Sequence, residues 1–147
     1  MFNINSINKN IKTQIKIAVL GAGNMGLSFS KSFLKYELIK PQNLHLITRS
    51  QNKKEKIKSV FSESEISSFD EVKNLEADLI IIAVKPQDFG FVAENLPFKI
   101  SEKSMILSIM AGISIEKIQK LLNHKSVVRA MPNSPTSSPE VKIKKKR

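Results

Sequence analysis

Three glycines near the start of the sequence have the spacing of a phosphate-binding turn. Gly21, Gly23 and Gly26 form the pattern G-x-G-x-x-G, directly after the apolar run at residues 17–20 and before a helical pattern of large apolar residues. In that context the pattern is typical of a dinucleotide site. Gly21 allows a tight turn, Gly23 lets a pyrophosphate approach the backbone, and Gly26 lets the helix pack against the sheet. The alternative is a glycine-rich turn that binds no ligand.

A second segment bears on which dinucleotide is bound. Residues 44–47 predict a strand, and Arg49, Ser50 and Lys53 follow it. At this point of a dinucleotide-binding fold a carboxylate binds the ribose 2′-hydroxyl of NAD, whereas an arginine suits the 2′-phosphate of NADP. No Asp or Glu occurs at residues 39–53, so the sequence favours NADP(H), with NAD(H) as the alternative cofactor. Ser50 can also cap the next helix while Arg49 is solvated, and both interpretations can hold together.

Alternating strands and helices position these segments. Apolar runs predict strands at residues 17–20, 44–47, 79–84, 105–110 and 127–131, with a shorter strand around Ile66. Helical patterns lie between them, ending near residue 39 for the first helix and covering residues 52–61, 70–75, 86–96 and 114–122 for the others. This order predicts an α/β fold, a single domain with a Rossmann-type doubly wound parallel sheet and strand order 3-2-1-4-5-6.

The carboxyl ends of the strands in such a sheet lie at one edge, and ligands bind there. The segments with unusual chemistry all fall at that edge, at residues 21–26, 48–50, 83–87, 110–112 and 131–135. Some of these segments also have a purely structural interpretation, since such residues can end a strand or allow close packing at its end. The segments with this alternative are Lys85-Pro86, Ala111-Gly112 and Pro132-Asn133. Their convergence with the glycine turn favours one ligand site.

Composition excludes several classes of function. The 147 residues include no cysteine, so a disulfide framework and a thiolate metal site are excluded, and we expect no metal. The longest apolar run, residues 79–84, is too short to span a bilayer, so we expect no membrane partner and a cytoplasmic protein. The net charge of +11 comes mostly from a general lysine bias, without basic patches that interleave with aromatic residues. We therefore expect no nucleic-acid partner.

The two ends of the sequence differ in composition from the part between them. Residues 1–14 are rich in Asn and Lys and contain no acidic residue, which predicts a disordered N-terminal extension. Residues 15–136 carry all the predicted strands and form the predicted dinucleotide-binding domain. Residues 137–147 end in VKIKKKR, and we interpret them as a disordered basic tail.

Four motifs, in this order and spacing, resemble those of pyrroline-5-carboxylate reductase. They are GAGNMG at residues 21–26, AVKPQ at 83–87, SIMAGIS at 108–114 and RAMPNSP at 129–135. The resemblance covers about residues 15–136. It implies an oxidoreductase of proline biosynthesis that uses NADP(H) to reduce the cyclic imine of a small-molecule substrate, 1-pyrroline-5-carboxylate, to proline.

The resemblance also implies roles for individual residues. The pyrophosphate would be held by Leu20, Gly21, Ala22, Gly23, Asn24, Met25 and Gly26. The adenosine ribose would be faced by Arg49 and Ser50. The nicotinamide half would be lined by Ala83, Val84, Lys85, Pro86, Met110, Ala111 and Gly112. The border of nicotinamide and imine would be formed by Lys85, Pro86, Met131, Pro132 and Asn133. No residue has an obvious proton-transfer role, so we assign no catalytic acid or base, and positioning is the main contribution.

The sequence departs from this family at its C-terminal end. Members of the family continue after the M-P-N motif with a helical domain that forms the dimer and supplies much of the substrate pocket. Here the sequence passes instead into the basic tail, an ending that a frameshift or a fragmented gene would produce. We therefore expect a truncated reductase or the cofactor-binding half of one, with slow or no turnover alone and without the dimer contacts of the family. The alternatives are an NADP-binding remnant without turnover and a basic protein that binds nucleic acid through its tail.

Overall fold

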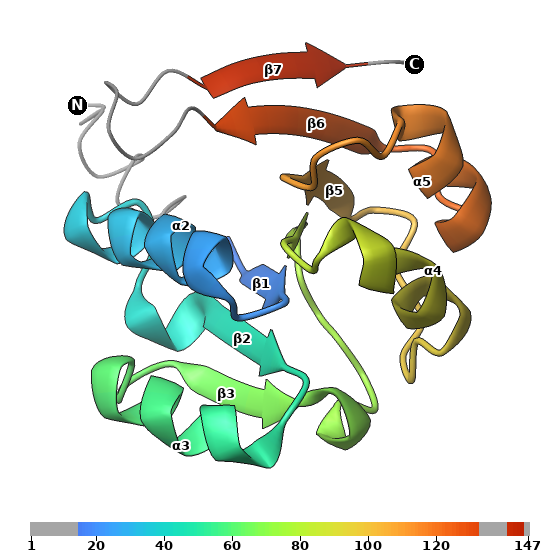
Figure 1. Cartoon of the computed structure of the whole chain (residues 1–147). Helices are drawn as coiled ribbons and strands as arrows, with labels where there is room; N and C mark the ends of the chain where they lie inside the picture. Colours follow the sequence, from blue (N-terminus) through green and yellow to red (C-terminus); the bar gives the residue numbers. More distant parts are fainter. Residues whose placement is uncertain (1–14, 133–140, 146–147) are drawn as a thin grey trace.

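A seven-stranded sheet lies at the centre of the computed structural model, which describes residues 15–132 and 141–145 (Figure 1). Its strands are β1 (Ile17–Leu20), β2 (Leu44–Thr48), β3 (Glu65–Ser68), β4 (Leu79–Ile82), β5 (Met105–Ser108), β6 (Val127–Pro132) and β7 (Val141–Lys145). They lie in the order β3-β2-β1-β4-β5-β6-β7, and every neighbouring pair except β6 and β7 is parallel. The predicted Rossmann-type sheet and the order of its first six strands are confirmed.

Helices cover both faces of this sheet. They are α2 (Asn24–Lys35), α3 (Gln51–Val60), α4 (Pro86–Glu94) and α5 (Ile115–Leu122), with the short 3-10 helices η1 (Pro41–Asn43) and η2 (Phe69–Glu71). α2 and α3 pack on one face, and α4 and α5 pack on the other (Figure 1). Within the described residues, none of these helices has the length and apolar character of a membrane span.

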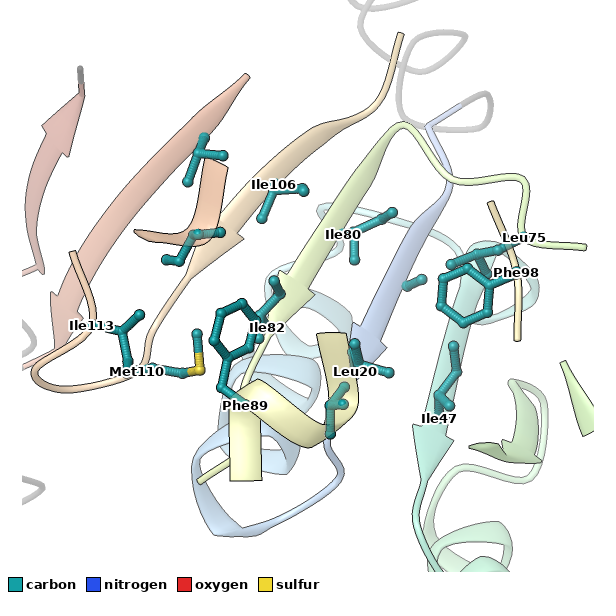
Figure 2. Packing of buried hydrophobic residues seen from close by; sticks show 14 of the residues in the cluster. Leu20, Ile47, Leu75, Ile80, Ile82, Phe89, Phe98, Ile106, Met110 and Ile113 are labelled. Atoms are coloured by element: carbon teal, nitrogen blue, oxygen red, sulfur yellow. The ribbon is translucent and has the colours of Figure 1, made fainter. Parts of the chain in front are cut away.

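Side chains alternate between the two faces of the sheet, and both faces are buried. In β1, Ala18 and Leu20 belong to the cluster under α4 and α5, whereas Ile17 and Val19 belong to the cluster under α2 and α3. Figure 2 shows the first cluster, with Phe89 of α4 pointing at the sheet. Burial on both faces explains why the central strands read as continuous apolar runs.

The first helix ends earlier than the sequence predicts, and a left-handed turn rather than Pro41 ends it. α2 stops at Lys35, and Glu37 has a φ of 53°. The N–H of Glu37 donates to the carbonyl of Leu34 at 3.1 Å, and the N–H of Leu38 donates to the carbonyl of Phe33 at 2.9 Å. These bonds satisfy carbonyls at the helix end, as in the turns that usually carry glycine. The sequence does not predict this left-handed turn, because the residue with positive φ is a glutamate rather than a glycine.

The predicted helix at residues 70–75 is a single 3-10 turn. The side chain of Ser68 and that of Glu71 cap each other's backbone at η2, and Val72 then has an extended conformation. Val72 and Leu75 are buried in the cluster under α4 and α5. The non-helical segment after η2 therefore still buries two apolar side chains, Val72 and Leu75.

Two strands are also shorter than predicted. β4 ends at Ile82 and β5 ends at Ser108, although the apolar runs continue for two more residues in each case. The hydroxyl of Ser108 accepts a hydrogen bond from the N–H of Met110 at 3.2 Å, so the chain already turns there. Residues 83–84 and 109–110 thus lie beyond the strand ends, at the edge where the sequence predicts a ligand.

The end of the described chain corrects the expectation of a disordered tail at residues 137–147. Residues 141–145 form β7, which pairs antiparallel with β6. The remainder of the expected tail lies outside the described residues, as does the expected extension at residues 1–14.

The unpaired edge of β6 and the alternation of residues in β7 together explain why β7 forms. Without β7, strand β6 would present a row of unpaired N–H and C=O groups at the edge of the sheet. Val141 and Ile143 alternate with lysines, and β-branched residues with a period of two favour a strand. The many lysines of this segment led instead to the prediction of a disordered basic tail.

Two glycines within helices provide a matched test of the packing. A Cβ atom at Gly26 of α2 would meet the carbonyl oxygen of Gly21 and lie 3.2 Å from side-chain atoms of Ala83 and Val19. A Cβ atom at Gly90 of α4 would meet nothing within 4 Å. We expect Gly26→Ala to destabilise the chain by about 1–3 kcal/mol, because a backbone contact must open.

We expect Gly90→Ala to act in the opposite direction and stabilise the chain by about 0.5–1 kcal/mol, through helix propensity alone. Urea unfolding followed by circular dichroism measures both effects. If the two substitutions changed the free energy of unfolding equally, α2 would not be packed against the glycine turn as described.

Candidate functional site

A cleft of about 410 Å³ opens at the carboxyl ends of β1, β2 and β4. This volume falls in the range of small-molecule and cofactor sites. Its walls come from the β1–α2 turn, the end of β2, η2, and the loop and first turns of α4. The lining residues are Leu20, Gly21, Ala22, Gly23, Ile47, Thr48, Arg49, Lys53, Phe69, Asp70, Ala83, Val84, Lys85, Asp88, Phe91 and Val92.

The glycine turn is held against the backbone that follows β4. Gly21 has a φ of 100°, and a Cβ atom there would lie 2.7 Å from the backbone nitrogen of Val84. The N–H of Gly21 also donates to the carbonyl of Ile47 at 3.0 Å. Only glycine fits this combination of a positive φ and a close backbone approach. The turn is therefore fixed to both neighbouring strands, β2 and β4.

Gly23 has a different environment from Gly21. It is exposed at the N-terminus of α2, and a Cβ atom there would meet nothing within 4 Å. No side chain caps α2 at this residue. The first-turn N–H groups of a helix have no intrahelical partner, and such an uncapped end favours an anion. The open space above Gly23 and the uncapped helix end together fit a phosphate group.

Arg49 lies at the other end of the cleft, just after β2. Its Nη1 atom lies 3.3 Å from Oδ2 of Asp88, and its guanidinium carbon lies 5.8 Å from the centre of the Phe91 ring. The Arg49 side chain is 67% exposed. The arginine is thus placed by two side chains of α4 while its charge remains accessible from the cleft.

Ser50 contributes by capping rather than by lining the cleft. Its hydroxyl accepts a hydrogen bond from the N–H of Lys53 at 3.3 Å and caps α3. It is not among the residues that line the cleft, whereas Arg49 and Lys53 are. In the structure the capping interpretation therefore describes Ser50, whereas Arg49 before α3 and Lys53 in its first turn line the cleft.

A hydrogen-bonded network fixes the wall formed by η2. The carboxylate of Glu71 accepts bonds from Lys54 Nζ at 2.7 Å, from Gln51 Nε2 at 3.0 Å and from the N–H of Ser68 at 2.9 Å. The bond from Lys54, together with those from Gln51 and Ser68, lowers the pKa of Glu71 from 4.5 to about 2. This ionised carboxylate ties the first turn of α3 to η2, and so holds Phe69 in the wall of the cleft.

The structure brings together part of the residue set that the sequence predicts. Leu20, the turn residues Gly21 to Gly23, Arg49 and the residues Ala83 to Lys85 all line the cleft. Asn24, Met25 and Gly26 form the first turn of α2 beside it, and Pro86 begins α4. The cleft therefore joins the predicted pyrophosphate turn, the predicted adenosine residue and the residues after β4.

The residues predicted from the last two strands lie apart from this cleft. The side chain of Met110 is 2% exposed and packs in the core near Phe89 (Figure 2). Ala111 and Gly112 are exposed after β5, and Met131 is half exposed near the end of β6. Pro132 is the last residue of β6, and Asn133 lies outside the described residues. A contact of Met110 with a ligand is therefore restricted to its backbone.

Sequence reasoning missed three residues of α4 that line the cleft, Asp88, Phe91 and Val92. Val92 is buried in the core cluster, whereas Asp88 and Phe91 are accessible to solvent. Both lie on one side of the first turns of α4, three residues apart. Phe91 is 60% exposed although it is a large apolar residue. Their spacing directly after AVKP was the available signal, since a helix that starts at the ligand edge presents its first turn there.

A known protein family matches the part of the chain that contains β1 to β5. Residues 16–112 match the family model described as NADP oxidoreductase coenzyme F420-dependent. A protein of Aquifex aeolicus (strain VF5) named pyrroline-5-carboxylate reductase is 36% identical over 122 residues, which cover 81% of this chain and 43% of that protein. The resemblance predicted from the four motifs is confirmed. The chain spans less than half the length of this relative.

Solved structures show the same fold. A pyrroline-5-carboxylate reductase of Coxiella burnetii has a TM-score of 0.75 and 24% identity, with 89% of this chain and 49% of that chain covered. The Plasmodium falciparum pyrroline carboxylate reductase, solved with NADP bound, has a TM-score of 0.71 and 24% identity over 91% of this chain and 49% of that chain. Both align with about half of the longer chain.

The network at Glu71 predicts how stability depends on pH. Because the folded-state pKa is lowered, its stabilising contribution is present above pH 4.5 and is lost as the pH falls towards about 2. We expect Glu71→Gln to lower the urea midpoint at neutral pH, and the difference from the unmodified chain to shrink across this window.

Glu63→Gln is the matched control, since Glu63 is an exposed glutamate outside this network and outside the cleft. Urea titrations of the three proteins at several pH values measure the effect. A difference between the Glu71→Gln variant and the unmodified chain that stayed constant down to pH 2 would contradict the role of the ionised carboxylate.

Proposed function

The chain belongs to the family described as NADP oxidoreductase coenzyme F420-dependent, and from this premise we propose that it binds NADP(H) in the cleft beside the β1–α2 turn. We further propose that it supplies the cofactor-binding half of a reductase that converts 1-pyrroline-5-carboxylate to proline. The observation that supports the first proposal most strongly is the exposed, unobstructed Gly23 at the uncapped end of α2.

The residues of the cleft fit the parts of a dinucleotide. The N-terminus of α2 presents N–H groups to the pyrophosphate, and Gly23 leaves its approach open. Arg49 and Lys53, at the end of β2, supply positive charge for the 2′-phosphate of the adenosine ribose. The backbone after β4, from Ala83 to Lys85, forms the side of the cleft between these two groups.

The proposed reaction depends more on how the nicotinamide and the imine are positioned than on acid or base groups of the protein. When bound, the nicotinamide supplies the hydride that reduces the imine carbon. The chain contributes a fixed turn, through the contact of Gly21 with the backbone of Val84, and a buried core beneath it. Such positioning is the main catalytic contribution expected of this half, since small errors of placement cost large factors in rate.

The proposed substrate rests on the relatives. The Aquifex aeolicus protein carries the name pyrroline-5-carboxylate reductase, and this chain covers 43% of it. The imine site is therefore proposed at the border of this half with a second, helical half. The proposed border residues on this chain remain Lys85, Pro86, Met131, Pro132 and Asn133.

The first prediction concerns the pyrophosphate turn. Because a side chain at Gly23 would enter the space proposed for pyrophosphate, we expect Gly23→Val to abolish NADPH binding while the circular dichroism spectrum is retained. Gly90→Ala, at a glycine away from the cleft, is the control and retains binding. Calorimetric titration with NADPH measures the affinities. Retained affinity in the Gly23→Val variant would assign the glycines to the turn alone.

The second prediction concerns the choice of cofactor. We expect the chain to bind NADPH more tightly than NADH, because Arg49 and Lys53 face the cleft after β2. Arg49→Gln is expected to weaken NADPH about tenfold, in line with the loss of a charge-assisted hydrogen bond, and to leave NADH within about twofold. Lys58→Gln removes the same charge from α3 outside the cleft and serves as the control. Equal affinities for both cofactors in the unmodified chain would refute the preference.

The third prediction concerns turnover. With 1-pyrroline-5-carboxylate present, we expect this chain alone to oxidise NADPH at least about a hundredfold more slowly than the enzyme median of about 10 per second. A fusion of residues 1–136 to the part of the Aquifex aeolicus relative that this chain does not match is expected to restore turnover. The loss of NADPH absorbance measures both rates. If the fusion bound NADPH and still failed to reduce this imine, the proposed substrate would be wrong.

A further inference from the structure

The fold places a carboxylate where the sequence predicts none. No Asp or Glu occurs at residues 39–53, which is the basis for favouring NADP(H). In the structure Asp88 of α4 also lines the cleft, and its Oδ2 atom lies 3.3 Å from Nη1 of Arg49. The cation proposed to bind a 2′-phosphate is therefore already paired with an anion. The charge of this end of the cleft is set by two segments that lie far apart in the sequence.

The geometry of α4 holds Asp88 at this place. The N–H of Asp88 donates to the carbonyl of Lys85 at 2.9 Å, which closes the first turn after Pro86. A carboxylate in the first turn is favoured by the helix dipole. Its side chain is 33% exposed, whereas that of Arg49 is 67% exposed. The acid is thus the more buried member of the pair and the arginine the more exposed one.

Phe91 fixes the arginine from a second side. Phe91 lies one helical turn after Asp88, and its ring centre is 5.8 Å from the guanidinium carbon of Arg49. A guanidinium at this distance is attracted to the face of the ring. Both α4 residues line the cleft together with Arg49. The three side chains therefore form one small unit, which we name the α4 clamp.

We propose that Asp88 is a specificity-determining residue that holds Arg49 through the α4 clamp and weakens the preference of the cleft for a 2′-phosphate. This inference rests on the proposed function, because it assigns the adenosine end of the cofactor to the cleft. A 2′-phosphate brings two negative charges close to the Asp88 carboxylate and competes with it for Arg49. A ribose 2′-hydroxyl meets no such repulsion, and a carboxylate can accept its hydrogen bond.

The size of the effect follows from the exposure of the pair. A unit charge at about 4 Å changes an affinity by about fivefold in water and by more near a protein surface, while solvent and salt reduce the effect for exposed pairs. Removal of the Asp88 charge is therefore expected to change the affinity for a 2′-phosphate by about three- to tenfold. The remaining part of the adenosine half carries no charge next to the clamp and is expected to be insensitive.

A purely structural role of Asp88 gives a different result. If its carboxylate served only the dipole of α4, its removal would lower the thermal midpoint and weaken every nucleotide by the same factor. The ratio of affinities for two ligands that differ only in the 2′-phosphate would then stay constant. This ratio is the measurement that separates the two roles.

The experiment uses the full chain and two probes, 2′,5′-ADP and 5′-AMP, which differ by the 2′-phosphate. Calorimetric titrations compare the unmodified chain with Asp88→Asn. We expect Asp88→Asn to bind 2′,5′-ADP about three- to tenfold more tightly and 5′-AMP within about twofold. Glu94→Gln is the matched control, because it removes the same charge from the end of the same helix, outside the cleft. We expect it to leave the ratio unchanged.

A second variant tests whether Asp88 acts through Arg49. In an Arg49→Gln background the gain from Asp88→Asn is expected to shrink, because the arginine it releases is gone. An unchanged ratio in Asp88→Asn, with both probes still bound by the unmodified chain, would overturn this inference and leave the proposed function standing. If the unmodified chain bound neither probe nor NADPH, the proposed function would fail and this inference with it.

Discussion

The close contact between two backbone segments organises the ligand edge of this protein. The turn after β1 passes so near the backbone after β4 that Gly21 has no room for a side chain beside Val84. A side chain at Gly26 would likewise meet the carbonyl of Gly21, so the first turn of α2 is pressed onto the same turn. Because of these contacts, the N-terminal ends of α2 and α4 both lie at the cleft.

The charges of the cleft complement this rigid frame. The uncapped end of α2 offers backbone donors at Gly23, where the structure leaves space. At the other end the cations Arg49 and Lys53 face the cleft, and Asp88 offsets one of them. The proposed function assigns the phosphate to these backbone groups and the choice between ligands to these side chains.

The sequence predicted the elements whose signals are local. The run from Ile17, the glycine spacing and the apolar run from Leu79 were enough to predict the parallel sheet, its strand order and the turn that lines the cleft. The end of α2 at Glu37, the strand β7 and the pairing of Arg49 with Asp88 were not predicted. Each of these depends on tertiary structure: a left-handed turn at a non-glycine residue, an open sheet edge, and a contact between distant segments. Periodicity and composition do not predict such tertiary contacts.

The central claim is that a dinucleotide lies on the turn after β1, and backbone amide NMR tests it most directly. Addition of NADPH to the isotopically labelled chain is expected to shift the amide signals of Gly21, Ala22 and Gly23, together with those of Arg49 and Lys85. Signals of α5, which packs on the sheet away from the cleft, are expected to stay in place. If NADPH left the three turn amides unchanged at saturating concentration, or shifted only residues outside the cleft, the account of this site would be contradicted.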